Sequence, residues 1–351
     1  MSIGPASATY FRLLRLALLI MAIAAVLCLL LLQKEAKREL PPHSELIEAS
    51  QYAMGFRYPR TEGELRALLE LYERKSEVPK TRPKGAIRAV VLPHAGYSYV
   101  GEMLSGAYAA LGTDYGRFII LSTEPFPSDK DKSFSLSIPR AKAYRNPFGE
   151  IPLWSTGEKL LEHEHFSSID GAHPNYRVEI HLPFLQFFFS DFEILPVVSS
   201  YSMALKDIGE AAEELSTLLD RNTLLILSSN LSTHCPYEES SRRDLNCINS
   251  ICSASPSEVL GCKASALPPL LMLKLIAEQK SWNCRVEDLK HSSDLKWWLE
   301  GDLVVGYPHL VFYESEATYG DEGKKTTSER LRDFENLDLV VESSGLCLEE
   351  K

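Results

Sequence analysis

The sequence lacks the features that nucleic-acid-binding and disulfide-rich proteins need. Its 351 residues include 37 Lys and Arg against 48 Asp and Glu, giving a formal net charge of −11. Because phosphate backbones bind basic surfaces, this balance argues against a nucleic-acid partner. The seven cysteines include no C-x-x-C pair and have no regular spacing. We therefore expect neither a disulfide framework nor a structural zinc site, and a reducing compartment is the simpler interpretation.

The familiar catalytic signatures are missing as well. The chain contains no G-x-S-x-G elbow, no Walker loop and no dinucleotide-binding glycine fingerprint. At 45% hydrophobic and 24% charged residues, it has the composition of a folded globular protein. Any chemistry must therefore come from residues that the fold brings together.

One long uncharged apolar run lies at residues 16–32, with basic residues on both sides. Seventeen helical residues extend about 25 Å, close to the lower limit for crossing a bilayer. No small-x-small cleavage site comes after it, which favours a single uncleaved transmembrane helix over a signal peptide. The slight basic excess after the run favours a cytoplasmic main domain. We expect residues 1–32 to form the anchor and residues 33–48 a linker.

The remainder alternates between strand-like and helical patterns. Short apolar runs at residues 87–92, 118–121, 192–198, 224–227 and 303–307 are typical of buried strands, with helical spacing between them. This order predicts an α/β domain over residues 49–316, with a mixed, mainly parallel sheet covered by helices. The acidic residues 317–351 are expected to form a disordered, solubilising tail.

Three of the predicted strands run into polar residues. His94 follows the first, Glu124 follows the second, and the stretch Ser228 to His234 follows another. If these strands are parallel neighbours, His94, Glu124 and His234 converge at one sheet edge, where zinc or non-haem iron could bind. The alternative is that His94 only caps its strand by hydrogen bonding.

Two other histidine-containing segments have competing interpretations. Glu179 and His181 share a face if their segment is a strand, and diverge if it is a helix. His181 could instead pack at a helix start and bind a backbone carbonyl. His163 and His165 lie in a charged segment and are interpreted as surface residues rather than ligands.

Several motifs together resemble the Memo family. They agree with the family in order and spacing, and the first is the most specific: PHAGYSYVG at residues 93–101, EIHLPF at 179–184, MGFRYP at 54–59, SSN at 228–230, HSSD at 291–294 and VGY at 305–307. The resemblance extends from about Met54 to Tyr313. It implies a fold related to the class III extradiol dioxygenases, with a pocket at the strand ends.

In this family the pocket can hold iron or copper through histidines and a cysteine. His94 matches the first family histidine, and Cys262 approximates the family cysteine. Pro125 stands where the family has its second histidine, and Asn230 stands where it has an aspartate. The resemblance therefore implies a pocket that has lost part of its ligand set.

Two functional hypotheses emerge. The first is a membrane-anchored Memo-like protein with a degraded metal pocket, which binds a peptide, protein or small molecule without turnover. The second is an iron- or copper-dependent redox enzyme. There His94, His234 and either Cys262 or Glu124 would hold the metal, and His181 with Glu179 would serve in acid–base catalysis.

Overall fold

The computed structural model describes ten parts of the chain. They are residues 21, 43–50, 53–78, 82–112, 115–124, 134–173, 175–253, 255–295, 303–314 and 340–343. The chain divides into two units, Met1–Pro41 and Pro42–Lys351. The predicted transmembrane helix lies outside the described residues, apart from Met21. Within the described ranges, no helix combines the length and apolarity needed to cross a bilayer.

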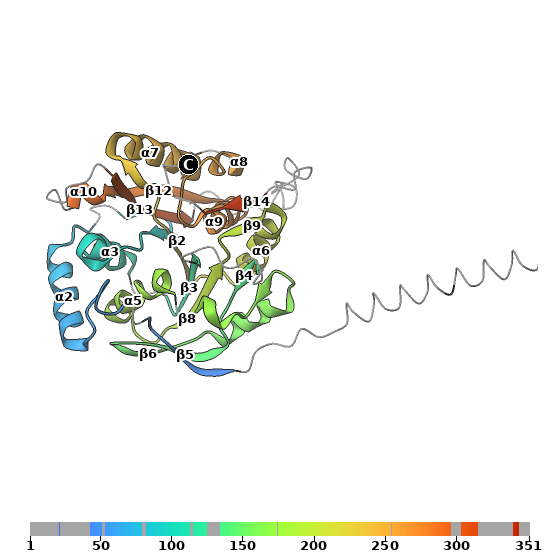
Figure 1. The fold of residues 1–351 in the computed structure, drawn as a ribbon, viewed down its shortest axis with the longest axis horizontal. Helices are drawn as coiled ribbons and strands as arrows, with labels where there is room; N and C mark the ends of the chain where they lie inside the picture. Colours follow the sequence, from blue (N-terminus) through green and yellow to red (C-terminus); the bar gives the residue numbers. More distant parts are fainter. Residues whose placement is uncertain are drawn as a thin grey trace, which may run out of the picture. The chain divides into compact units, whose positions relative to one another are not determined.

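Four parallel strands form the centre of the main sheet (Figure 1). They lie side by side in the order β2 (Ile87–Leu92), β10 (Thr223–Ser228), β3 (Arg117–Thr123) and β8 (Glu193–Ser199). Every residue of β2 and β10 is buried, as expected for strands covered on both faces. The strands before His94 and before the Ser228–His234 stretch are thus parallel neighbours, which meets the condition for these two segments to share one sheet edge.

Antiparallel pairs extend this sheet at both sides. The sheet is therefore mixed, as predicted, but its described strands form as many antiparallel as parallel pairs, so it is not mainly parallel. On one side β13 (Leu303–Glu314) pairs with β2, and β11 (Thr233–Pro236) and β12 (Trp282–His291) pair with β13. On the other side β4 (Leu136–Ser137) pairs antiparallel with β8, and β7 (Phe166–Ser167) pairs parallel with β4.

Helices cover both faces of the sheet, as predicted (Figure 1). Along β2, Val90 and Leu92 enter one apolar cluster, whereas Ala89 and Val91 enter the other, because successive strand side chains point to opposite faces. The first cluster includes α2 (Glu62–Lys75), α3 (Tyr97–Leu111), α4 (Tyr176–Glu179) and α5 (Leu182–Phe188). The second includes α6 (Leu205–Thr217), α7 (Tyr237–Ser253), α8 (Pro256–Val259) and α9 (Leu267–Gln279).

The last residue of the PHAGYSYVG motif has a packing role. Gly101 lies in α3, and a Cβ at this position would overlap the ring of Tyr72 in α2. The Tyr72 hydroxyl donates a hydrogen bond of 2.8 Å to the carbonyl of Tyr97 at the start of α3. The glycine therefore lets α2 approach the helix that comes after His94.

Two strands lie outside residues 49–316, the range predicted for the α/β domain. Residues 44–48, expected in the linker, form β1 (Ser44–Glu48), which pairs with β5 (Ala141–Asn146), and β5 pairs with β6 (Gly149–Pro152). In the expected tail, β14 (Val340–Glu342) pairs with β9 (Ser202–Ala204). Val341 is 3% exposed. Composition alone missed these two strands because each gains its stability from tertiary pairing.

The cysteines also differ from expectation, because the domain contains disulfides. Cys247 is bonded to Cys262, and Cys252 is bonded to Cys284. Cys235 is disulfide-bonded as well. Cys247 and Cys252 both lie in α7, whereas their partners lie in the segment before α9 and in β12. The spacing of the cysteines in the sequence therefore gave no sign of these disulfides.

Removing the first of these cross-links should destabilise the domain. Cys247 and Cys262 are separated by 15 residues, and closing a loop of this size stabilises a fold by about 3 kcal/mol. The double variant Cys247→Ser/Cys262→Ser should lose about that much free energy of unfolding in urea. Mass spectrometry after alkylation checks the native bonds. Free native thiols together with unchanged stability would contradict the disulfide.

Candidate functional site

The centre of the candidate site is His94, two residues beyond the end of β2. Its side chain is buried, and the residue is only 3% exposed. The backbone N–H of His94 donates to Asn230 Oδ1 at 3.0 Å, and ring atom Nδ1 lies 3.2 Å from Ser228 Oγ. His94 therefore joins the end of β2 to the end of β10, as parallel neighbours at one sheet edge permit.

The hydrogen-bond network determines which nitrogen of His94 carries the proton. Ser228 Oγ donates its single proton to the carbonyl of Arg177 at 2.7 Å, so it accepts from His94 Nδ1. On the other side of the ring, Ser265 Oγ lies 3.4 Å from Nε2. Because Nδ1 carries the proton of the neutral ring, Nε2 is the unprotonated nitrogen, an assignment made from the partners of Nδ1. It is also the only ring nitrogen with a lone pair for a metal, and it faces a serine hydroxyl.

The surroundings keep His94 neutral. Burial lowers the pKa of His94 well below its ordinary value, and the nearby Arg177, His181 and Arg57 lower this pKa further. A fully buried imidazole beside two guanidinium groups would lose solvation and gain repulsion on protonation. His94 is therefore suited to hydrogen bonding rather than to carrying charge.

Arg57, Tyr176 and Arg177 surround His94, and sequence reasoning missed the two arginines. The guanidinium carbon of Arg57 lies 3.9 Å from the centre of the Tyr176 ring, and that ring meets the His94 ring edge-on with centroids 6.0 Å apart. Arg177 Nη1 donates to the carbonyl of Ser265 at 2.9 Å. The available signal was the adjacent Tyr176, which by the resemblance to the Memo family stands where that family has a histidine.

The other predicted metal ligands do not gather around His94. Glu124 Oε1 accepts from the backbone N–H of Tyr201 at 2.7 Å, beyond the end of β8 rather than of β10. His234 is exposed on β11, where its backbone φ is 54°. Cys262 is bonded to Cys247 and so offers no thiolate.

The donor atoms near His94 differ from those that iron or copper requires. Among the described residues, one group of three His, Cys, Asp or Glu side chains is close enough to hold a metal, and it consists of Glu164, His165 and Glu210. None of the three belongs to the residues around His94, called here the His94 cluster: His94, Arg57, Tyr176, Arg177, Ser228, Asn230 and Ser265. Metals of this kind need several nitrogen, sulfur or carboxylate ligands. The residues around His94 therefore do not fit iron or copper.

Glu179 and His181 lie in a helical segment, so their side chains diverge. Glu179 ends α4, and its Oε1 accepts from the N–H of Ser50 at 2.9 Å and from the hydroxyl of Tyr144 at 2.8 Å. His181 precedes α5, and its Nδ1 lies 2.9 Å from the hydroxyl of Tyr108. Both residues are 0% exposed. In this structure neither reaches a surface where it could exchange a proton with a ligand.

Burial changes the protonation of both groups. It raises the pKa of Glu179 to about 7, although the hydrogen bonds from Ser50 and Tyr144 act in the opposite direction. It lowers the pKa of His181 to about 3. Desolvation disfavours the charged form in each case.

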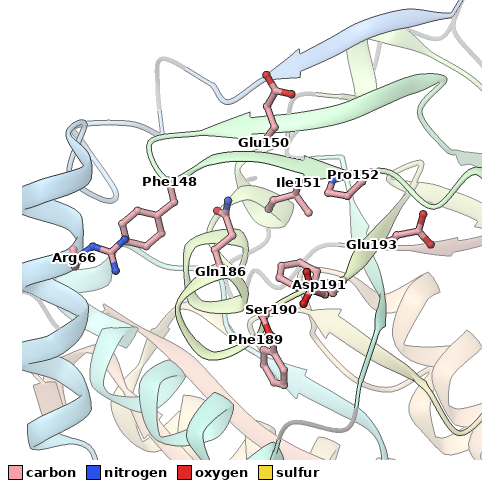
Figure 2. A pocket seen from close by; sticks show the side chains of 11 residues that line it. Arg66, Phe148, Glu150, Ile151, Pro152, Gln186, Phe189, Ser190, Asp191 and Glu193 are labelled. Atoms are coloured by element: carbon pink, nitrogen blue, oxygen red, sulfur yellow. The ribbon is translucent and has the colours of Figure 1, made fainter.

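A separate surface cavity of about 450 Å³ lies between α2, the β5–β6 hairpin and the end of α5 (Figure 2). Its wall includes Arg66, whose guanidinium carbon is 5.0 Å from the Phe148 ring centre, together with Gln186 and Glu193. No residue of the His94 cluster lines it. The cavity therefore does not belong to the candidate site.

Comparison with known proteins finds a family model that matches most of this chain. Residues 50–311 match the model of the Memo-like protein family. This range contains the whole His94 cluster.

Individual relatives agree with the family match. A MEMO1 family protein of Desulfurococcus amylolyticus is 25% identical over 286 residues, which is 75% of this chain and 98% of the relative. One from Aquifex aeolicus is 29% identical over 193 residues, covering 53% and 68% respectively. One from Aeropyrum pernix is 28% identical over 238 residues, covering 63% and 81%.

The raised pKa of Glu179 predicts a pH-dependent stability. Since this pKa is about 7 when folded against an ordinary 4.5, the folded protein retains a proton that the unfolded chain releases between these values. The resulting stabilisation is full below about pH 4.5 and is lost as pH rises through about 7. The free energy of unfolding of the wild type should therefore fall as pH rises through this window. In Glu179→Gln this fall should be smaller by up to about 3 kcal/mol.

Urea denaturation of both proteins from pH 4.5 to 8 measures this difference. Glu70→Gln, a change at an exposed carboxylate of α2, controls for the loss of one acidic group. Parallel stability curves for the wild type and Glu179→Gln would show that Glu179 titrates normally.

Proposed function

This chain belongs to the Memo family, and we propose that it is a membrane-anchored member that acts by binding a partner rather than by metal-dependent turnover. The observation that carries the proposal is the position of the His94 ring. Its two nitrogens lie 3.2 Å from Ser228 Oγ and 3.4 Å from Ser265 Oγ. Each ring nitrogen therefore faces a serine hydroxyl. A metal site would need further imidazole, carboxylate or thiolate ligands around the metal-binding nitrogen.

Electrostatics support the same conclusion. Arg177 and Arg57 are close enough to His94 to lower its pKa, so a dication bound at Nε2 would experience the same positive field. Like charges a few ångströms apart repel strongly where solvent is excluded. The two arginines therefore oppose metal binding at His94, and the redox alternative gains no support from this site.

The outer part of the cluster suits a peptide or protein. Phe56 is 75% exposed, and the adjacent Arg57 stacks on the half-buried ring of Tyr176. Aromatic and arginine side chains are enriched at the energetic centres of protein interfaces. Phe56, Arg57 and Tyr176 are the residues that we propose to contact the partner.

The membrane part of the proposal rests on the uncharged residues 16–32. The disulfides Cys247–Cys262 and Cys252–Cys284 support an orientation opposite to the one expected from charge. Structural disulfides persist in oxidising compartments and are rare in the cytosol. We therefore propose that the folded domain lies on the non-cytoplasmic side of the membrane.

Metal analysis tests the proposal that the protein acts without a metal at His94. Full-length protein purified in detergent should contain iron and copper at levels that His94→Ala and His94→Asn leave unchanged, because His94 holds no metal. Inductively coupled plasma mass spectrometry measures these contents, and circular dichroism checks that the variants fold. Stoichiometric iron or copper that both variants lose would contradict the proposal.

Deletion of residues 1–33 tests the anchor. The intact chain should stay in the membrane pellet after carbonate extraction, and the deleted chain should move to the supernatant, because residues 16–32 would supply the membrane-spanning segment. A control deletion of residues 2–11, before the apolar run, should leave the protein in the pellet. Release of the intact chain by carbonate would refute the anchor.

A further inference from the structure

A second histidine cluster lies away from His94, between α6 and the segment before β7. His163, Glu164 and His165 connect η1 (Ser155–Glu162) to β7. Glu210 and Glu214 stand one helical turn apart on α6, so they present their side chains on the same helix face. Two imidazoles and three carboxylates therefore meet between two elements distant in sequence.

His165 lies at the centre of this cluster and is buried, so the interpretation of this residue as a surface histidine is wrong. Its side chain is only 6% exposed, its Nδ1 lies 3.5 Å from Glu210 Oε2, and its Nε2 lies 3.1 Å from Glu214 Oε1. One ligand atom from each of Glu164, His165 and Glu210 can be chosen so that all three lie within 4.8 Å of one another. A nearly buried imidazole thus faces a carboxylate at each ring nitrogen.

We propose that Glu164, His165 and Glu210 form a binding site for a divalent transition-metal ion such as Zn²⁺. Zinc binds nitrogen and oxygen at about 2.0–2.2 Å in tetrahedral sites, which puts neighbouring ligand atoms about 3.4 Å apart. The 3.5 Å between His165 Nδ1 and Glu210 Oε2 matches this spacing. The third ligand atom, from Glu164, lies within 4.8 Å of the other two, and water would occupy the fourth position.

Glu214 orients the imidazole for this role. Glu214 Oε1 lies 3.1 Å from His165 Nε2. With a metal on Nδ1, the ring proton is on Nε2 and is donated to Glu214, and the Nδ1 lone pair is directed toward Glu210. Metal-binding histidines commonly donate their second ring N–H to a carboxylate, which fixes the tautomer and strengthens the ligand. His163 Nδ1 also lies 2.6 Å from Glu214 Oε1 and holds this carboxylate in place.

The charges around the cluster favour a cation. Two ligand carboxylates balance a dication, and Glu214 adds a third negative charge beside it. Lys206 brings a positive charge to the edge of the cluster, where its Nζ lies 3.5 Å from Glu210 Oε1. Because the Lys206 side chain is 75% exposed and contacts the other oxygen of Glu210, it leaves Oε2 for the metal. The bound ion would link the segment before β7 to α6.

Calorimetric titration of ZnCl₂ into EDTA-treated, tag-free full-length protein tests this site. We expect one equivalent to bind, with affinity reduced at least tenfold in His165→Ala and in Glu210→Gln. Glu214→Gln should weaken binding by about 10- to 100-fold, because it loosens a ligand without removing one. The thermal midpoint should rise with zinc in the wild type and respond less in these variants.

Two matched controls separate this site from other histidines. His43→Ala removes an exposed imidazole that also pairs with a glutamate, Glu158, at 2.8 Å, and His94→Ala removes the imidazole of the family site. Both should leave zinc binding unchanged. Failure of the wild type to bind zinc, or binding equally tight in His165→Ala and Glu210→Gln, would overturn the proposal. Should His165→Ala fail to fold, Glu210→Gln at its half-exposed position decides.

Discussion

The hydrogen bond between the His94 ring and the Ser228 hydroxyl is the interaction on which this site depends. It connects the ends of two adjacent, fully buried strands, β2 and β10. Ser228 in turn donates to the carbonyl of Arg177, so the helix α4 is tied to the same point. One imidazole therefore sets the positions of a strand end, a turn and a helix, and its protonation state is determined by that network.

Much of the fold could be predicted from the sequence, because buried parallel strands leave continuous apolar runs. The position of His94 at the sheet edge is evident from such a run and the residues after it. The direction of Glu124 could not be predicted, because it depends on a backbone N–H supplied by Tyr201. The disulfides of Cys247 and Cys252 likewise arise from tertiary packing rather than from sequence spacing.

The Memo motifs predict the fold of this domain better than they predict the chemistry of the site at His94. The PHAGYSYVG segment keeps its structural role, seen in the close approach of Gly101 to Tyr72. Near His94, however, buried Arg177 and half-buried Arg57 supply the positive charge. A protein interior tolerates a charge only where hydrogen bonds or opposite charge compensate it. Fixed guanidinium groups and a metal ion are therefore alternative ways to make this edge electropositive.

Anomalous X-ray diffraction is the most direct test of whether His94 binds a metal. Crystals of the protein would be soaked in Fe²⁺ or Cu²⁺ under matched conditions, and difference maps collected at the absorption edge of each metal. We expect no anomalous peak at His94 Nε2, with Ser265 remaining beside that nitrogen. A fully occupied peak within bonding distance of His94 Nε2 would contradict the loss of metal binding.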